Sequence, residues 1–231
     1  MLHQICSCVA VALMPLFTLS SQHVTYKFTR HYNEKVVEFE ARRDIDANTI
    51  VMLGDSHTEL GKDWSARLGV PNVVNYGIIG DNTEGVIHRL CQITPHHPKA
   101  IFLLIGANNV TKHVTAEQVF EGCKAIIDSI RSQTPTTKLY VQSLFPINER
   151  FRRWKPLVGQ TDKIPQINAL LAAYCRDKGV VYIDMFSRLK MGRTNILRKD
   201  LTADGLHLSP LGYGVWEREL RKYVATEVAE R

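Results

Sequence analysis

Five short apolar runs, separated by longer segments with helical spacing, constrain the fold of this chain most. The runs cover residues 50–53, 73–79, 100–105, 139–144 and 180–185. Apolar runs of this length, bounded by turn residues, are typical of strands buried on both faces. Parallel strands need a crossover connection, which the intervening helical segments can supply. We therefore predict an α/β fold with a five-stranded parallel sheet covered on both faces.

The segments between the runs place apolar residues on one helical face. In residues 115–130 that face would carry Val119, Cys123, Ile126, Ile127 and Ile130. The same spacing predicts further helices over residues 83–93, 162–175 and 209–224. Residues 24–46 are polar and charged, and we expect either an additional helix or a strand packed at the edge of the sheet.

The chain of 231 residues, 45% of them hydrophobic, fits one domain with a sizeable core, and no repeat or linker divides it,. An apolar run over residues 5–19 precedes small and polar residues, so we expect residues 1–21 to be a secretory signal peptide. No Lys or Arg precedes Lys27, which leaves an apolar amino-terminal helix of a cytosolic protein as an alternative. The run is shorter than the ~20 apolar residues that span a bilayer, so we expect no stable membrane insertion. The prediction is an exported protein, periplasmic or secreted, with a single domain over residues 22–231.

The formal net charge of +6 invites a nucleic-acid function, but most basic residues are scattered along the chain,. The densest group comprises Arg150, Arg152, Arg153 and Lys155, interleaved with Phe151 and Trp154. A solvated loop beside the active-site rim is the favoured interpretation, and a basic-aromatic surface is the alternative. The group lies in residues 146–161, the least regular stretch, which we expect to form a mobile loop over the site. We expect no nucleic-acid partner.

Cysteine and histidine positions indicate no metal site. Cys91, Cys123 and Cys175 are far apart, so we interpret them as packed free thiols,. His96 and His97 are adjacent between two prolines, without a cluster of acidic or cysteine ligands,. No phosphate-cradling or dinucleotide glycine motif is present either. We expect neither a metal nor a cofactor.

A serine and a distant Asp-x-x-His pair supply the groups for nucleophilic catalysis. Ser56 follows the first apolar run in Gly-Asp-Ser-His, at the carboxyl end of a predicted strand,. Asp204 and His207 could orient and supply the base that such a serine needs. Each motif alone is equally typical of an ordinary turn or of a helix cap beside a surface histidine.

Two further strand ends favour the catalytic interpretation. The second predicted strand ends in glycines, where the backbone N–H of Gly80 could approach a substrate oxygen,. The third ends in Gly106-Ala107-Asn108-Asn109, and an asparagine side chain can donate to an oxyanion. Such preorganised donors are commonly worth about 3 kcal/mol each in the transition state.

Taken together, these stretches resemble a known family. Gly54-Asp55-Ser56, Gly80-Asp81, Gly106-Ala107-Asn108 and Asp204-Gly205-Leu206-His207 match, in order, the blocks of the SGNH (GDSL-type) hydrolases. The form of the second and third blocks is most similar to the platelet-activating-factor acetylhydrolase-like acylesterase branch.

The resemblance implies a three-layer α/β/α flavodoxin-like fold and a catalytic triad of Ser56, Asp204 and His207. It also implies an oxyanion hole formed by the backbone N–H groups of Ser56 and Gly80 and the side chain of Asn108. The chain departs from the pattern at His57, where leucine is common. We expect His57 to be a partly exposed residue of a first helical turn, and a contribution to substrate binding is the alternative.

We therefore expect a serine esterase that removes a short acyl group, acetyl in the first instance, through an acyl-serine intermediate. An acetylated carbohydrate is the expected substrate, and a lysophospholipid or longer acyl ester is the alternative. A carbohydrate-binding module that has lost turnover and an acyltransferase would use the same fold. Homodimers are common in the family, and no feature of this sequence indicates whether this chain forms one.

Overall fold

The structure, a computed structural model, describes residues 28–111 and 113–229. The predicted signal peptide, residues 1–21, lies outside the described residues. Within the described ranges, every helix is too short or too polar to serve as a membrane span.

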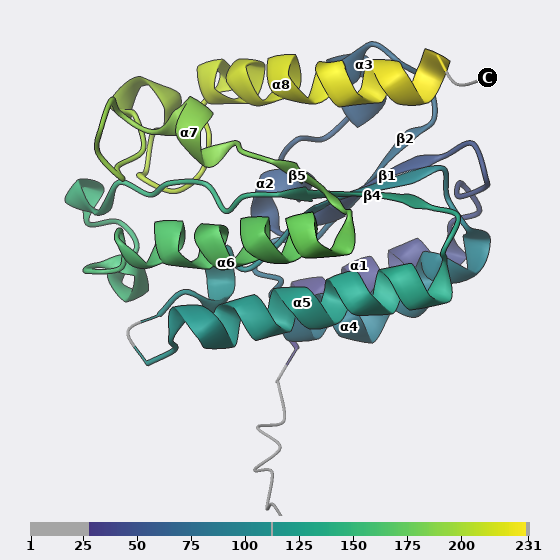
Figure 1. Ribbon diagram of the computed structural model, residues 1–231, viewed down its shortest axis with the longest axis horizontal. Helices are drawn as coiled ribbons and strands as arrows, with labels where there is room; N and C mark the ends of the chain where they lie inside the picture. The colour runs from purple at the N-terminus through teal and green to yellow at the C-terminus, as the bar shows by residue number, and fades with distance from the viewer. Residues whose placement is uncertain (1–27, 112, 230–231) are drawn as a thin grey trace, which may run out of the picture.

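All five predicted strands form, and they lie in one fully parallel sheet (Figure 1). They are β1 (Ile50–Gly54), β2 (Val73–Gly77), β3 (Ala100–Leu104), β4 (Lys138–Gln142) and β5 (Val181–Ile183), in the order β2-β1-β3-β4-β5. At the ends of the strands Gly54 pairs with Gly77 on one side and Leu104 on the other. The chain leaves β1 toward one edge and later enters β3 on the other side. The carboxyl ends of β1 and β3 therefore flank the topological switch point, where open α/β sheets bind ligands.

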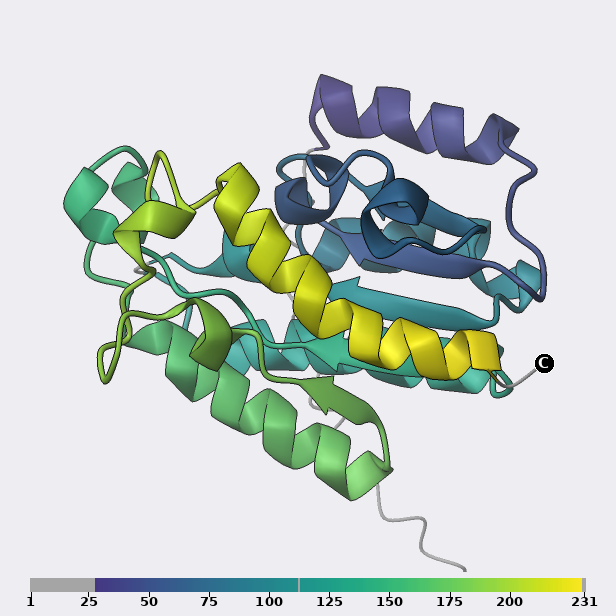
Figure 2. The same ribbon diagram turned by 90° about the horizontal axis from the view of Figure 1, so that it is seen from above.

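Helices cover both faces of the sheet, as predicted. They are α1 (Arg30–Ala41), α2 (Ser56–Glu59), α3 (Trp64–Leu68), α4 (Thr83–Arg89), α5 (Ala116–Gln133), α6 (Lys163–Lys178), α7 (Phe186–Leu189) and α8 (Pro210–Ala229). Figure 1 shows α1, α4, α5 and α6 on one face, and α3, α7 and α8 on the other. The turned view in Figure 2 shows α8 lying across its face of the sheet. The three-layer α/β/α fold is confirmed.

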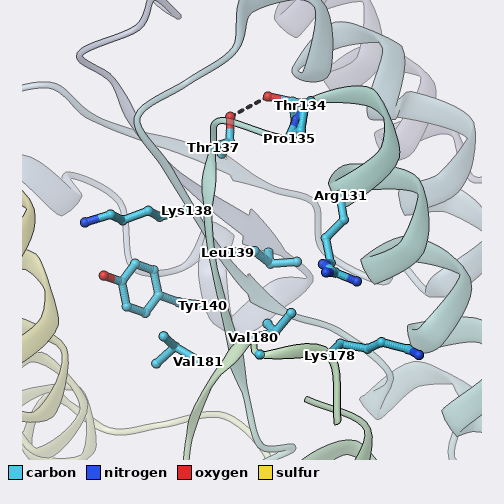
Figure 3. Close-up of a pocket in the computed structure, with 11 residues that line it drawn as sticks. Arg131, Thr134, Pro135, Thr137, Lys138, Leu139, Tyr140, Lys178, Val180 and Val181 are labelled. Atoms are coloured by element: carbon cyan, nitrogen blue, oxygen red, sulfur yellow. Dashed lines mark hydrogen bonds between the residues drawn. The ribbon is translucent and has the colours of Figure 1, made fainter. Parts of the chain in front are cut away.

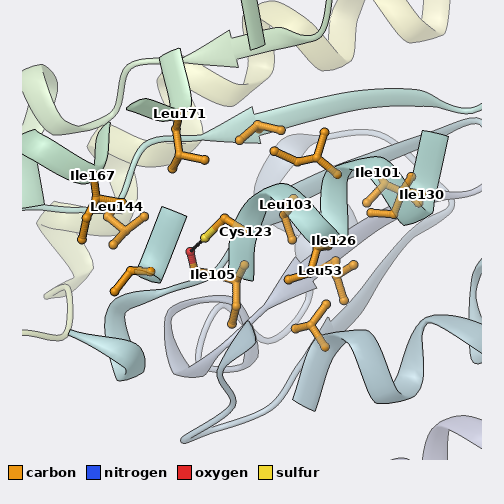
Figure 4. Packing of buried hydrophobic residues seen from close by; sticks show 14 of the residues in the cluster. Leu53, Ile101, Leu103, Ile105, Cys123, Ile126, Ile130, Leu144, Ile167 and Leu171 are labelled. Atoms are coloured by element: carbon orange, nitrogen blue, oxygen red, sulfur yellow. Dashed lines mark hydrogen bonds between the residues drawn. The ribbon is translucent and has the colours of Figure 1, made fainter. Parts of the chain in front are cut away.

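Alternate residues of the strands supply the two cores. Val51 and Leu53 of β1 belong to the core beneath α4, α5 and α6, whereas Ile50 and Met52 belong to the core beneath α3 and α8. In the first core, Ile126 of α5 packs beside strand residues such as Leu103 (Figure 4). A strand whose every residue is buried must be apolar on both sides, which explains the unbroken apolar runs in the sequence.

Local signals set the ends of the helices. Thr115 and Gln118 form a capping box at the start of α5,. The predicted helix over residues 83–93 is α-helical only as far as Arg89 and continues in 3₁₀ turns. Pro95 lies in the second of these turns, Thr94–His96, and a proline disfavours α-helical geometry in the residue before it. The ambiguous residues 24–46 contain a helix, α1, rather than an edge strand.

The described cysteines are free. Cys123 and Cys175 are buried as predicted, and the Cys123 Sγ donates to the carbonyl of Ile105 over 3.5 Å. Burial raises the pKa of the Cys123 thiol to about 12. The prediction that all three are packed is wrong for Cys91, which is exposed, because α4 and the turn after it leave this position on the solvent side.

Two isoleucine substitutions test this layering. Ile126 is fully buried, so Ile126→Ala should lower the free energy of unfolding by about 2–5 kcal/mol through lost contacts and a residual cavity,. Ile87, on α4, is 39% exposed, and Ile87→Ala should change the free energy by less than about 0.5 kcal/mol,. Urea denaturation followed by circular dichroism measures both, and equal losses would contradict the arrangement.

Candidate active site

Ser56 stands at the first position of α2, immediately after β1. Asp55 caps this short helix, because its side chain accepts a hydrogen bond from the N–H of His57 over 3.0 Å. The turn is tight: a Cβ on Gly54 would lie 2.3 Å from the carbonyl oxygen of Leu104 and 2.4 Å from the Thr58 hydroxyl. Only glycine fits there, so the Gly-Asp-Ser sequence presents the serine hydroxyl at the carboxyl edge of the sheet.

The three residues predicted as a triad come together in one hydrogen-bonded chain. Ser56 Oγ lies 3.0 Å from His207 Nε2. His207 Nδ1 lies 2.8 Å from Asp204 Oδ2. The other oxygen of Asp204 accepts the N–H groups of Leu206 at 2.9 Å and His207 at 2.8 Å. The loop therefore fixes the carboxylate, which in turn orients the imidazole toward the serine.

The electrostatics of Asp204 favour the ionised carboxylate. Burial by itself would raise its pKa, but the hydrogen bonds from the His207 ring and from the N–H groups of Leu206 and His207 outweigh this effect. The pKa of Asp204 is therefore below its ordinary value. A carboxylate in this position stabilises the imidazolium that forms when His207 takes a proton from a serine.

The three residues predicted as an oxyanion hole line one cavity beside His207. Ser56, Gly80 and Asn108 contribute to the wall of this cavity, whose volume is about 270 Å³. Gly80 adopts a φ of +80°, which suits glycine and turns the chain after β2 toward the cavity,. Asn108 Nδ2 donates one hydrogen to the carbonyl of Asp81 over 2.7 Å. Since an amide nitrogen carries two hydrogens, the second is available to a ligand.

A buried ion pair fixes the turn that carries Gly80. Arg89 Nε donates to Asp81 Oδ2 over 2.9 Å, and Arg89 Nη2 donates to the carbonyl of Gly54 over 3.1 Å. Both side chains are fully buried. Burial raises the pKa of Asp81 to about 6, although the charge of Arg89 opposes the shift. The Arg89 guanidinium therefore connects the turn after β2 to the carboxyl end of β1. Sequence reasoning gave Arg89 no role, because nothing local distinguishes it from a surface arginine.

Two asparagines, Asn75 in β2 and Asn109 after β3, contact the helices that precede these strands in the chain. Asn75 Nδ2 lies within 3.1 Å of the carbonyls of Thr58, Glu59 and Lys62, so β2 holds the end of α2 and the turn after it. Asn109 Oδ1 accepts the N–H of Thr83 over 3.1 Å. Of the two, only Asn109 belongs to a motif singled out in the sequence, and both roles depend on contacts that only the folded chain makes.

Comparison with known proteins agrees with this geometry. The model of the GDSL-like Lipase/Acylhydrolase family matches residues 47–215. The chain belongs to this family. Platelet-activating factor acetylhydrolase IB subunit alpha1 of Rattus norvegicus is 32% identical over 176 residues, which cover 71% of this chain and 69% of the relative. The Homo sapiens protein of the same name is 32% identical over 170 residues, covering 71% of this chain and 70% of the relative.

A solved structure shares the fold of this chain. The GDSL-like lipase from Bacteroides thetaiotaomicron superposes with a TM-score of 0.72 at 19% identity, covering 84% of this chain and 97% of the other. Among the residues that the structure describes, no group of three His, Cys, Asp or Glu side chains is arranged to hold a metal ion.

His57 is buried, which corrects the prediction of a partly exposed side chain. Only 3% of it is exposed. Its Nε2 lies 3.1 Å from the carbonyl oxygen of Leu206, and its Nδ1 lies 3.2 Å from Asp55 Oδ1. The Tyr213 hydroxyl of α8 donates to the His57 carbonyl over 2.7 Å. The sequence could not show that α8 and the loop before His207 would cover the first turn of α2.

The buried histidine links the serine turn to the histidine loop. Burial by itself would lower the pKa of His57, but the hydrogen bond and the charge of Asp55 outweigh it, so the pKa is raised above its ordinary value. The Leu206 carbonyl and the charge of Asp204 act in the same direction. Since Leu206 precedes His207, His57 connects the two loops that must meet for Ser56 and His207 to touch.

The loop of residues 146–161 lies at the site, as predicted. Its Trp154 packs edge-on against the ring of His207, with centroids 5.2 Å apart. The Asn148 N–H donates to the Gly205 carbonyl over 2.7 Å, so the loop is fixed to the segment that carries Asp204 and His207. In Figure 2 the two segments, green and yellow-green, lie together at one end of the sheet. Mobility of the loop stays a prediction.

Replacing His57 should produce a stability difference that depends on pH. We expect His57→Gln to lower the free energy of unfolding by roughly 1–3 kcal/mol, because it leaves buried partners unsatisfied. Protonated His57 stabilises the fold fully below the ordinary histidine pKa of about 6.5, and this contribution is lost as the pH rises through the raised pKa. Urea denaturation of both proteins should therefore show a larger difference at pH 6 than at pH 9. A difference independent of pH would contradict a charged His57.

Proposed function

We propose that this chain hydrolyses short-chain carboxylic esters through an acyl-Ser56 intermediate. The observation that carries the proposal is the continuous hydrogen-bonded chain from Asp204 through His207 to Ser56, which ends at a cavity that Asn108 and Gly80 also line. A nucleophile, its base, the group that orients the base and donors for an oxyanion are the four parts that acyl transfer requires.

In the proposed reaction, Ser56 Oγ attacks the ester carbonyl while His207 Nε2 takes the hydroxyl proton. The tetrahedral intermediate collapses, the bond to the alcohol oxygen breaks, and His207 returns the proton to the leaving alcohol. A water molecule then repeats the same steps on the acyl-enzyme, which releases the acid and restores Ser56. Asp204 stays ionised throughout and stabilises the imidazolium.

The oxyanion of each tetrahedral intermediate would be bound by three donors. These are the backbone N–H groups of Ser56 and Gly80 and the Asn108 Nδ2. The hydrogen bond from Asn108 to the Asp81 carbonyl orients the amide before substrate binds. Preorganised donors of this kind need no rearrangement when charge develops, which is why they stabilise the transition state more than the ground state.

The cavity supports a short acyl group, acetyl in the first instance. Its volume of about 270 Å³ is below the range of about 300–1,000 Å³ that holds drug-sized ligands,. Trp154, Pro156 and Leu157 close one side of it. The names of the curated relatives also support removal of an acetyl group. Two classes of substrate are candidates for the alcohol part of the ester. An acetylated carbohydrate would suit an enzyme that is exported, and a lipid ester would agree with the names of the relatives.

Removal of the nucleophile or the base tests the reaction directly. Ser56→Ala and His207→Ala should each lower kcat/KM for para-nitrophenyl acetate by about 10⁴-fold or more, because the two residues act as one unit. Ser187 is exposed and lies on α7, so Ser187→Ala is the matched control and should keep full activity. Activity that survives in both triad variants would defeat the proposed mechanism.

The length of the acyl chain tests the specificity. Across para-nitrophenyl esters from acetyl to decanoyl, kcat/KM should be highest for acetyl and should fall with chain length, because apolar wall residues such as Ile79 and Val110 limit the cavity. Val110→Ala should raise turnover of butanoyl and hexanoyl esters relative to acetyl. A preference of the unmodified enzyme for long chains would instead indicate a lysophospholipase or lipase.

A further inference from the structure

We propose that the four exposed cations of residues 150–155 bind a negatively charged group on the substrate, so that this enzyme prefers anionic esters. We call Arg150, Arg152, Arg153 and Lys155 the cationic rim. The inference rests on the proposed esterase function and adds the chemical class of the substrate: a small ester that carries a carboxylate, phosphate or sulfate.

The first observation is the position of the rim. Arg153 and Lys155 are the chain neighbours of Trp154, which packs against the His207 ring and lines the cavity. Pro156, the next residue, also lines the cavity. Since consecutive Cα atoms are about 3.8 Å apart, Arg153 and Lys155 lie directly beside the wall of the cavity, and Arg152 is one residue further along the chain. The charges of the rim act over a Debye length of about 8 Å at physiological ionic strength.

The second observation is that the charges of the rim are not compensated. All four side chains are exposed. Among the described residues, none of the four has a carboxylate within ion-pair distance, whereas other surface arginines such as Arg30 and Arg198 are paired with Glu34 and Asp200. Glu149 is the one acid in residues 146–161. Its carboxylate accepts the N–H of Gly159 and holds the two parts of the loop together.

The third observation is that no carboxylate, lysine or arginine side chain belongs to the wall of the cavity. The wall includes apolar residues such as Ile79, Val110 and Leu157. A cation of the neighbouring segment, Lys163, donates to the carbonyls of Thr111 and Val114. Recognition of a charged group must therefore take place outside the cavity. Over the described residues 28–111 and 113–229, the lysine and arginine residues that directly neighbour a wall residue in sequence are Arg153 and Lys155, and both belong to the rim.

The mechanism places the charged group on the alcohol side of the ester. The leaving oxygen must come within hydrogen-bond reach of His207 Nε2 to receive its proton. Trp154 contacts the same imidazole, so the alcohol passes along Trp154 and toward the rim. Three of the four cations are guanidinium groups, whose planar donors match carboxylate and phosphate oxygens in pairs.

Matched substrates test the inference. We would compare para-acetoxybenzoate, which is anionic, with its neutral amide, para-acetoxybenzamide, because both release a similar phenol. In the variant Arg152→Gln/Arg153→Gln/Lys155→Gln, KM for the anionic ester should rise roughly 5- to 20-fold, and KM for the neutral ester should stay within about twofold. Because the rim is exposed, KM of the unmodified enzyme for the anionic ester should rise with salt, and this dependence should be weaker in the variant.

Three cations at the far end of the sheet provide the control. Arg131 and Lys178 line a hollow at the amino ends of β4 and β5, opposite the serine (Figure 3). Arg176 is exposed in the same last turn of α6 as Lys178. The variant Arg131→Gln/Arg176→Gln/Lys178→Gln removes the same total charge far from the site. It should leave KM for both esters unchanged, which separates local binding from the effect of net charge.

Three outcomes would overturn the inference. Equal changes in KM for both esters, or none, would show that the rim does not recognise the anion. If the unmodified enzyme but not the rim variant cosediments with phosphatidylglycerol vesicles while KM for the soluble anion is unaffected, the rim would be a lipid-surface contact. Absence of Ser56-dependent hydrolysis of either ester would defeat the proposed esterase function itself. Hydrolysis of both esters without discrimination would leave that function intact.

Discussion

The buried pair of Arg89 and Asp81 is the interaction on which the site depends. The guanidinium reaches both the carboxylate after β2 and the Gly54 carbonyl at the end of β1. The carbonyl of the same Asp81 orients the amide of Asn108 at the end of β3. Arg89 therefore positions the ends of β1 and β2 relative to each other. Asp81, to which Arg89 binds, also contacts the end of β3.

A buried ion pair of this kind contributes little net stability to a fold. Removing two charges from water costs more than their attraction returns unless the geometry and the hydrogen bonds are nearly complete, and apolar replacements are often neutral or stabilising. Within the described part of the chain, Arg89 Nη1 and Asp55 Oδ2 are buried without a hydrogen-bond partner. The site therefore contains unsatisfied polar atoms, while the hydrogen bonds of Arg89 fix the geometry of the strand ends.

The sequence predicted the sheet well because each strand is buried on both faces, so its apolar run can be read without knowing its neighbours. It predicted Ser56 and His207 through motifs whose spacing is local. Their contact, in contrast, joins residues 151 positions apart. His57 shows the limit most clearly. It lies in the first turn of a short helix and was expected to be partly exposed, but α8 and the Leu206 carbonyl cover it.

By itself, the sequence determined which chemical groups stand at the ends of the strands and the period with which apolar residues repeat. Both are local properties of the chain, and they fix the α/β class and the residue types for acyl transfer. Only the tertiary structure decided that Arg89 would be buried and that Trp154 would lie against His207. These outcomes depend on segments that meet after crossovers and loops, and no local pattern specifies which side chains long-range packing brings into contact.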